Sequence, residues 1–405
     1  MEHPGAHGPL HGLRVCELST VLAGPYCTMV LADLGAQVTK VEPLEGDATR
    51  GYGPPWIGSG QGPAERLSAY FASINRNKRS LRVDLRQPDG AEILRKLIAR
   101  SDVLVENFRP GALERLGFDR AVLEALNPKL VHLSITGSGT VGPDAARPGY
   151  DFVAQAVGGL MSVTGFADEE GGQPTKLGVA ITDIVTGLFG AVGILAALRS
   201  GVGQRIDVSL LESTLAILIN QAHNAFASGE QPARRGNAHP NIVPYETFAT
   251  SDGQIAVAVG SERQWKRLCS ALGLPELADD IRFADNDARV RNRAELRPLI
   301  AARLEALTSA GALAALDGAE VPCAPVNDVL DAFASAQARA RQMRVQVDHP
   351  VLGPIDQIGL PYNLSATPAS IREAPPLLGQ HGVEVLTELG LEPATIRALR
   401  ERGVI

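Results

Sequence analysis

Short apolar runs alternate with longer amphipathic segments along the N-terminal part of the chain, a pattern typical of an α/β fold with a parallel sheet. Residues 13–42 show it most clearly as strand, loop, helix and strand, in the segments LRVCEL, STVLAGP, YCTMVLADLGA and QVTKVE. Further strands are predicted in SLRVDL, DVLVENF and KLVHLSI. We therefore expect an open, mostly parallel, Rossmann-like sheet, in which ligands bind beyond the carboxyl ends of the strands.

The most apolar segment, residues 177–198, has the sequence LGVAITDIVTGLFGAVGILAAL and a single charge, Asp183. Gly187, Gly190 and Gly193 would form a stripe on a helix and allow close backbone approach. The uncharged run after Asp183 is shorter than the about 20 residues that span a bilayer, so we expect a core helix rather than a membrane anchor. Two interpretations of Asp183 remain open: a helix N-cap, or a partly desolvated carboxylate that acts as a nucleophile.

A polar, turn-rich segment, GEQPARRGNAHPN at residues 229–241, is the clearest change of composition along the chain. We place a domain boundary close to it. Residues 242–325 again alternate between strand and helix patterns and predict a second, smaller α/β domain.

Composition and charge narrow the function. The 405 residues are 45% hydrophobic and 20% charged, as in a globular enzyme, and the net charge of −7 argues against a nucleic-acid partner. No signal or transit peptide is evident, and we expect a cytoplasmic protein with no membrane partner. The cysteines have no metal-ligand spacing and are expected to be reduced; they are Cys16, Cys27, Cys269 and Cys323.

Polar residues follow the predicted strand DVLVENF, where a doubly wound sheet binds its ligands. They are Asn107, Phe108, Arg109 and Arg115. Arg115 is suited to a bidentate bond with a phosphate, although all four are also compatible with an ordinary loop and helix surface.

A GxGxxG pattern at Gly137, Gly139 and Gly142 follows the predicted strand KLVHLSI. A dinucleotide site of this kind needs a long helix directly after the glycines. Pro143 and Pro148 prevent one, so we expect a flexible loop and no nicotinamide cofactor.

Six segments in order resemble the class III CoA-transferases, the family of formyl-CoA transferase and carnitine CoA-transferase. They are VLAGPYCTMVLADLGAQVTKVE, NRNKRSLRVDL, VENFRPGALERLGF, GYDFVAQAVGGLMSVTG, VAITDIVTG and PPLLGQH. INRNKRS, GVAITDIVTGLF and RRGNAHPNIVPYETF are most similar to the succinyl-CoA:glutarate type of dicarboxylate CoA-transferase. The resemblance covers nearly the whole chain.

The resemblance implies a catalytic role for Asp183, CoA thioesters as substrates, no permanently bound cofactor or metal, and an interlocked homodimer. It also implies a large domain at 1–225, a small domain at 226–330, and a linker and C-terminal segment at 331–405 that completes the large domain. The implied CoA contacts are Leu22, Ala23, Val83, Asp84, Leu85, Arg86, Asn107, Phe108, Arg109, Arg115, Arg147 and Tyr150.

The chain departs from the formyl-CoA transferase pattern in three places. Leu22 replaces a glutamine, Pro43 replaces an arginine that holds the nucleotide, and RRGNAHPN replaces a run of glycines. These changes argue against formyl or oxalyl substrates. We expect a C4–C6 dicarboxylate and succinyl-CoA instead. The candidate groups for the distal carboxylate are Arg234, Arg235, Asn237 and His239, unless this segment is only a basic surface turn.

A racemase and a non-catalytic nucleotide-binding module are the two alternative functions. The racemase branch of the family uses a histidine base in a GHD motif, where this chain has Tyr150 in GYD. A phenol with a pKa near ~10 is a poor base at neutral pH. A non-catalytic nucleotide-binding module would explain the sheet, but not a lone carboxylate in an apolar, glycine-rich setting.

Overall fold

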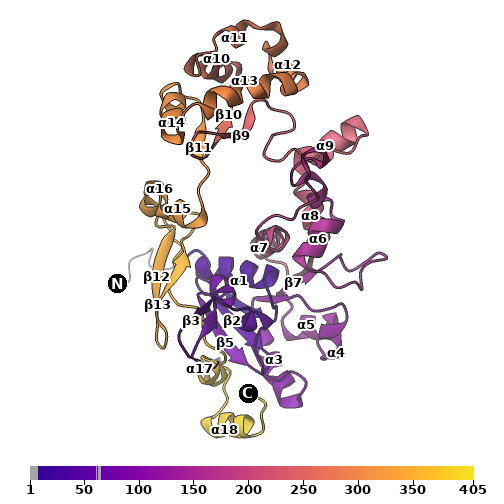
Figure 1. The fold of residues 1–405 in the computed structure, drawn as a ribbon. Helices are drawn as coiled ribbons and strands as arrows, with labels where there is room; N and C mark the ends of the chain where they lie inside the picture. Colours follow the sequence, from indigo (N-terminus) through magenta and orange to yellow (C-terminus); the bar gives the residue numbers. More distant parts are fainter. Residues whose placement is uncertain (1–7, 61, 63–64) are drawn as a thin grey trace. The chain divides into compact units, whose positions relative to one another are not determined.

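The computed structural model describes residues 8–60, 62 and 65–405 (Figure 1). The chain divides into two compact units. The larger comprises the described residues of Met1–Gly158, Gly178–Ile217 and Ser335–Ile405, and the smaller comprises Gly159–Leu177 and Leu218–Ala334. The domain limits expected from the sequence, 1–225, 226–330 and 331–405, remain a prediction, because a compact unit is not by itself shown to fold alone.

The larger unit is built on a six-stranded sheet whose order is β5-β2-β1-β6-β7-β8. Every pairing in this sheet is parallel. The strands are β1 (Arg14–Glu17), β2 (Gln37–Glu42), β5 (Lys78–Arg82), β6 (Val103–Glu106), β7 (Val131–Thr136) and β8 (Gln204–Ser209). The order reverses direction between β1 and β6, which is the Rossmann arrangement and places the ligand crevice at that point. The fold class expected from the sequence is confirmed.

Helices cover both faces of this sheet and form two apolar cores. On one face α1 (Ala23–Asp33) and α7 (Ile181–Ser200) pack against β1, β6 and β7. The other face is covered by α3 (Pro88–Ala99), α5 (Arg120–Leu126), α17 (Gly382–Glu388) and α18 (Pro393–Glu401). The C-terminal helices thus complete the core of the N-terminal sheet.

The glycine stripe of α7 allows the close packing that the sequence predicts. A Cβ atom on Gly187 would lie 2.6 Å from the carbonyl oxygen of Ala23 in α1, and one on Gly190 would lie 2.8 Å from Leu133. By length and composition α7 is long enough to cross a membrane, a test that core helices of soluble proteins also pass. One side of α7 packs on α1 and on the sheet, as a core helix does.

The remaining elements of the larger unit are short. They are β3 (Trp56–Ile57), β4 (Leu67–Ser68), α2 (Ala69–Ile74), α4 (Ala112–Arg115), α6 (Asp151–Val157), α8 (Leu210–Ala216), α16 (Ala336–Ala340), β12 (Arg344–His349) and β13 (Gly353–Ile358). β3 pairs with β4 and β12 with β13, both antiparallel.

The smaller unit contains a three-stranded antiparallel sheet in the order β11-β10-β9. Its strands are β9 (Tyr245–Ala249), β10 (Gln254–Ala258) and β11 (Cys323–Pro325). The helices are α9 (Ile219–Ser228), α10 (Glu262–Ala271), α11 (Glu276–Asp279), α12 (Asn286–Arg291), α13 (Arg293–Glu305), α14 (Ser309–Gly318) and α15 (Val329–Ala334). Trp265, Phe283 and Leu296 lie in its core.

Candidate functional site

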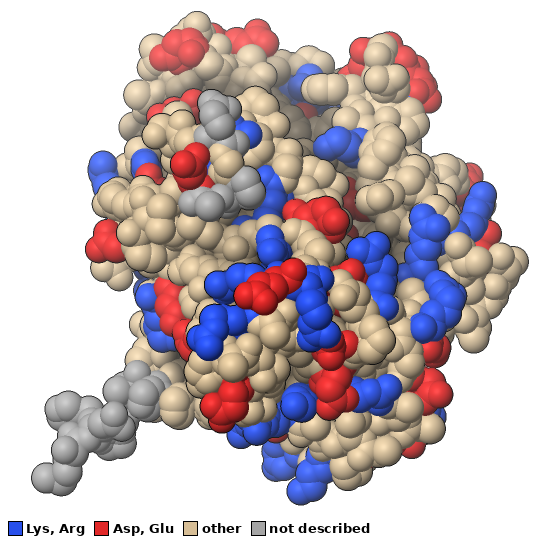
Figure 2. Space-filling model, turned by 90° about the horizontal axis from the view of Figure 1, so that it is seen from below, with Lys and Arg blue, Asp and Glu red and all other residues tan. Residues whose placement is uncertain are grey.

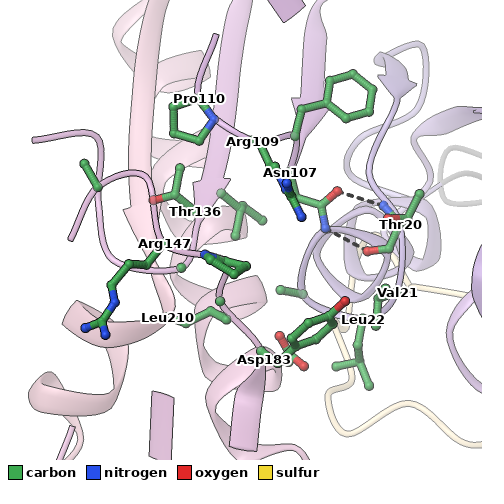
Figure 3. A pocket seen from close by; sticks show the side chains of 18 of the residues that line it. Thr20, Val21, Leu22, Asn107, Arg109, Pro110, Thr136, Arg147, Asp183 and Leu210 are labelled. Carbon is green, nitrogen blue, oxygen red and sulfur yellow. Dashed lines mark hydrogen bonds between the residues drawn. The ribbon is translucent and has the colours of Figure 1, made fainter. Parts of the chain in front are cut away.

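A cavity of about 330 Å³ lies in the larger unit where β1, β6 and β7 end (Figure 3). The loop from β1 to α1 forms one wall, and the loops after β6 and β7 form others. The first turn of α7 contributes Asp183. The lining residues are Thr20, Val21, Leu22, Ala23, Asn107, Phe108, Arg109, Pro110, Ile135, Thr136, Gly137, Ala145, Ala146, Arg147, Pro148, Gly149, Tyr150, Asp183 and Leu210.

Asp183 is not the N-cap of its helix. α7 begins at Ile181, and the preceding residue forms no side-chain capping bond. The Thr182 N–H, in the first turn of α7, instead donates to Asp151 Oδ1 at 2.9 Å. A carboxylate from α6 therefore caps α7. The N-cap interpretation of Asp183 is therefore wrong, and its side chain is left to face the cavity (Figure 3).

Within the part of the chain that the structure describes, the Asp183 carboxylate has no compensating partner. No described residue forms an ion pair or a hydrogen bond with it. Burial raises the pKa of Asp183, and the nearby charge of Asp151 raises it further, to about 7. Such a carboxylate is poorly solvated, and near neutral pH it is available as a nucleophile or as a proton carrier.

Asp151 is a residue of this site that the sequence interpretation missed. Its Oδ1 caps α7, and its Oδ2 accepts a hydrogen bond from Gln155 Nε2 at 2.8 Å. Its signal in the sequence is its position directly after Tyr150, at the start of a predicted helical stretch.

The cavity brings together eight of the residues predicted for the site. They are Leu22, Ala23, Asn107, Phe108, Arg109, Arg147, Tyr150 and Asp183. Arg109 is exposed and forms no ion pair with a described residue, whereas Arg147 pairs with Asp144 at 3.2 Å. Figure 3 shows Arg147 on the side of the cavity opposite Thr20.

Five predicted CoA contacts do not line this cavity. Val83, Asp84, Leu85 and Arg86 follow β5, which is the outer strand of the sheet, and Val83 is buried in the core. Arg86 pairs with Asp84 at 2.8 Å. Arg115 ends the short helix α4 and is exposed. A long ligand that extends from the cavity along the sheet edge would be needed to reach them.

The glycine pattern after β7 forms a loop, as the prolines predict. Gly139 and Gly142 have positive φ angles of 94° and 98°, and the next helix is the short α6. A Cβ atom on Gly149 would lie 2.2 Å from the Cα of Gly137. The two glycines let the loop fold back on itself at the cavity wall instead of cradling a pyrophosphate.

Three of the four residues predicted for the distal carboxylate are engaged within the smaller unit. Arg234 pairs with Asp168, and Asn237 Nδ2 donates to Thr247 Oγ1 at 2.9 Å. His239 Nδ1 accepts from the Asn241 N–H at 3.1 Å. Arg235 is exposed and has no ion pair with a described residue.

Four buried charges beside the β1–α1 loop also escaped the sequence interpretation. Lys40 Nζ lies 2.9 Å from both Glu17 and Asp47, and Lys78 Nζ lies 3.0 Å from Glu17. All four side chains are 0% exposed. Their spacing along the sequence does not indicate that they are neighbours. They become neighbours only because β1, β2 and β5 pair side by side in the sheet.

The described residues contain no group of three or more His, Cys, Asp or Glu side chains able to hold a metal ion. All four cysteines are free. Figure 2 shows acidic and basic side chains interspersed on the face seen from below. A single basic surface of the kind that binds nucleic acid is not present on that face.

Known proteins resemble the chain over nearly its full length. A model of CoA-transferase family III matches residues 10–382. The chain is 44% identical over 392 residues to the succinate–glutarate CoA-transferase of Agrobacterium fabrum, with 95% of this chain and 97% of that protein covered. It is 38% identical over 401 residues to the succinyl-CoA:mesaconate CoA-transferase of Haloarcula marismortui, with 96% and 98% covered.

A solved structure has the same fold. The crystal structure of a CAIB/BAIF family protein from Brucella suis superimposes with a TM-score of 0.83 at 44% identity, covering 95% of this chain and 100% of that one.

Proposed function

Because the chain belongs to CoA-transferase family III, we propose that it transfers CoA from succinyl-CoA to a C4–C6 dicarboxylate with Asp183 as the nucleophile. The chain is a CoA-transferase. Relatives named for glutarate and mesaconate support a dicarboxylate acceptor. The observation that carries the proposal is the position of Asp183, a carboxylate with no described partner, in a cavity at the switch point of the sheet.

In the proposed reaction, an Asp183 oxygen attacks the thioester carbonyl of the donor. The C–S bond breaks, which leaves an aspartyl mixed anhydride and CoA thiolate. The thiolate then attacks the Asp183 carbonyl and releases the donor acid, so that CoA is held as an aspartyl thioester. The acceptor carboxylate repeats these two steps in reverse, and the ionised Asp183 is restored. No proton or electron is gained or lost overall.

The electrostatics of the site fit this chemistry. A carboxylate in water is a weak nucleophile because it is strongly solvated, whereas partial burial of Asp183 removes part of that solvation. Asp151 adds a second negative charge that disfavours the ionised ground state of Asp183. Formation of the neutral anhydride or thioester relieves both costs, so the environment favours the covalent intermediates.

We assign the CoA contacts to two groups. Leu22, Ala23, Asn107, Phe108, Arg109, Arg147 and Tyr150 would hold the part of the thioester that enters the cavity. Val83–Arg86 and Arg115 would hold the distal nucleotide, because they lie outside the cavity but at the same carboxyl edge of the sheet. Arg109 offers a phosphate an exposed guanidinium that pairs with no described carboxylate.

Recognition of the distal carboxylate is assigned to the 234–239 segment of the smaller unit. Arg235 is its principal candidate, because Arg234, Asn237 and His239 already have partners there. No permanently bound cofactor or metal enters the proposed reaction.

We also propose that the active form is a homodimer in the cytoplasm. The outer side of α7 supports a partner subunit, because Leu188, Phe189 and Val192 are 41%, 42% and 64% exposed. Exposed apolar side chains gathered on one helix mark an association surface. Phe152 and Val157 on α6 are exposed in the same unit. Four free cysteines agree with a reducing compartment.

The proposal is tested by trapping the intermediate. The enzyme is incubated with succinyl-CoA, treated with hydroxylamine, digested and analysed by mass spectrometry. A hydroxamate at Asp183 is expected, and its absence from a turning-over enzyme would exclude the covalent route through this residue. Succinyl-CoA is then assayed against acetate, succinate, glutarate and mesaconate. Faster transfer to acetate than to every dicarboxylate would overturn the assigned acceptor class.

A further inference from the structure

The loop between β1 and α1 has an uncommon backbone conformation at the cavity wall. Val21 has a φ of 67°, in the left-handed region that β-branched residues rarely adopt. Val21, Leu22 and Ala23 line the same cavity as Asp183. A conformation of this kind persists only where the surrounding structure holds it. The groups that hold it therefore decide the shape of this wall.

Side chains from two directions bind the peptide groups of this loop. Asn107 Oδ1 accepts from the Thr20 N–H at 2.9 Å, and Asn107 Nδ2 donates to the Thr20 carbonyl at 2.8 Å (Figure 3). From the buried side, Asp47 Oδ1 accepts from the Val21 N–H at 3.4 Å, and Lys40 Nζ donates to the Ser19 carbonyl at 2.7 Å. Two consecutive peptide groups, Ser19–Thr20 and Thr20–Val21, are thus each held by side chains at both the carbonyl and the N–H.

Asp47 is itself held rigidly. Its Oδ1 accepts from the Thr49 N–H at 2.9 Å and from the Thr49 hydroxyl at 2.8 Å, and its Oδ2 lies 2.9 Å from Lys40 Nζ. Its own N–H donates to Glu42 Oε2 at 3.0 Å. These bonds leave Asp47 little freedom, so it can impose a fixed position on Val21.

We propose that Asp47 and Asn107 are positioning residues for CoA transfer, which hold the Val21–Ala23 backbone in a fixed place beside Asp183. This inference rests on the proposed function. Within the described chain the N–H groups of Leu22 and Ala23 form no hydrogen bond. A fixed loop keeps these donors available to the oxygen on which negative charge develops, and such preorganisation acts on the transition state more than on binding. Asn107 thereby has a role beyond the CoA contact assigned to it.

The test compares Asp47→Ala and Asn107→Ala with a matched control, Asp33→Ala. Asp33 is also a buried carboxylate in an ion pair, with Arg76 at 2.7 Å, but it ends α1 and does not line the cavity. For each folded variant the melting temperature, the Kd for free CoA, and kcat with succinyl-CoA are measured. We expect kcat to fall roughly 10- to 100-fold for the two loop variants, while Asp33→Ala loses stability but keeps kcat. The Kd for CoA should stay within about threefold of wild type for Asp47→Ala, whereas Asn107→Ala should also weaken CoA binding, because Asn107 is an assigned CoA contact.

Asp47→Asn supplies the rescue, because its side-chain oxygen can still accept from Val21 and Thr49. It is expected to recover most of the kcat that Asp47→Ala loses. Two results would overturn the inference: loop variants with the kcat of the control, or an Asn107→Ala enzyme that loses CoA affinity but not kcat. Hydroxylamine trapping of the wild type separates the two proposals. If Asp183 is labelled but the loop variants turn over normally, only the positioning role is wrong.

Discussion

The carboxylates of Glu17 and Asp47 lie close to the same cavity as Asp183 but have the opposite electrostatic environment. Burial raises the pKa of Glu17 and of Asp47, but the charge of Lys40, together with hydrogen bonds to both groups and the charge of Lys78 on Glu17, outweighs burial, and the net pKa is lowered in both cases. Asp183 is partly buried and has Asp151 rather than a lysine as its charged neighbour, and burial together with Asp151 raises its pKa to about 7. The two environments therefore differ in their charged partners.

This difference separates carboxylates that support the structure from the one proposed to react. A buried charge with complete partners fixes the backbone around it, as Asp47 does for Val21. A buried charge without such partners has a raised free energy in its ionised form, and a reaction that neutralises the charge lowers that free energy.

The largest effect is expected when the unpartnered carboxylate is removed. Asp183→Asn should lower the transfer rate by at least about 10⁴-fold, since an amide oxygen does not form the anhydride. The fold should survive, because α7 is capped by Asp151 and not by Asp183. Steady-state assays together with circular dichroism and CoA titration provide the check. Normal turnover by the folded variant would mean that Asp183 is not the nucleophile.

The partnered set should instead respond in stability. Glu17→Gln leaves Lys40 and Lys78 buried with only Asp47 as counter-charge, and a loss of roughly 3–5 kcal/mol in the free energy of unfolding is expected. Glu124→Gln, at an exposed pair with Arg120, is the control and should cost less than about 1 kcal/mol. Urea unfolding of both variants compares them. Equal losses would show that the network is not a rigid support.

The third effect concerns pH. Asp183 must be ionised to attack, so kcat/KM for succinyl-CoA at saturating acceptor should rise about tenfold between pH 6 and pH 8 around the pKa of about 7. A flat profile over this range would contradict the raised pKa of Asp183.

The raised pKa of Asp183 also makes the free energy of unfolding depend on pH. The pKa of Asp183 is above its ordinary value of 3.8, so between these values the folded protein binds more protons than the unfolded chain. The stability that protonated Asp183 contributes is present below about pH 4 and is lost as the pH rises through about 7. The advantage of Asp183→Asn over wild type in unfolding free energy should grow across this interval.

The smallest effect is expected for exposed cations, which solvent screens. Arg109→Ala should raise the KM for succinyl-CoA by roughly three- to tenfold, because a phosphate loses its partner. This corresponds to about 1 kcal/mol of binding free energy. Arg115→Ala should raise it less, because Arg115 does not line the cavity. A larger effect at Arg115 would place the phosphates along α4 instead.

The sequence by itself determined the class of fold and singled out Asp183, the proposed nucleophile. Apolar runs at strand spacing predicted the parallel sheet, and the isolated charge in residues 177–198 marked Asp183, because both signals depend on neighbours along the chain. It also excluded a dinucleotide site after Gly142, since Pro143 prevents the required helix. These inferences needed no contact between distant segments.

Only the tertiary structure decided which of the predicted residues share one site and what Asp183 does in its helix. Asp151 and Thr182 are 31 positions apart, and the bond that frees Asp183 from capping exists only after α6 and α7 meet. Glu17, Lys40 and Lys78 come from three strands and form a network only when β1, β2 and β5 pair. The physical reason is that pKa and hydrogen bonding depend on distances in space, which a pattern along the chain does not contain.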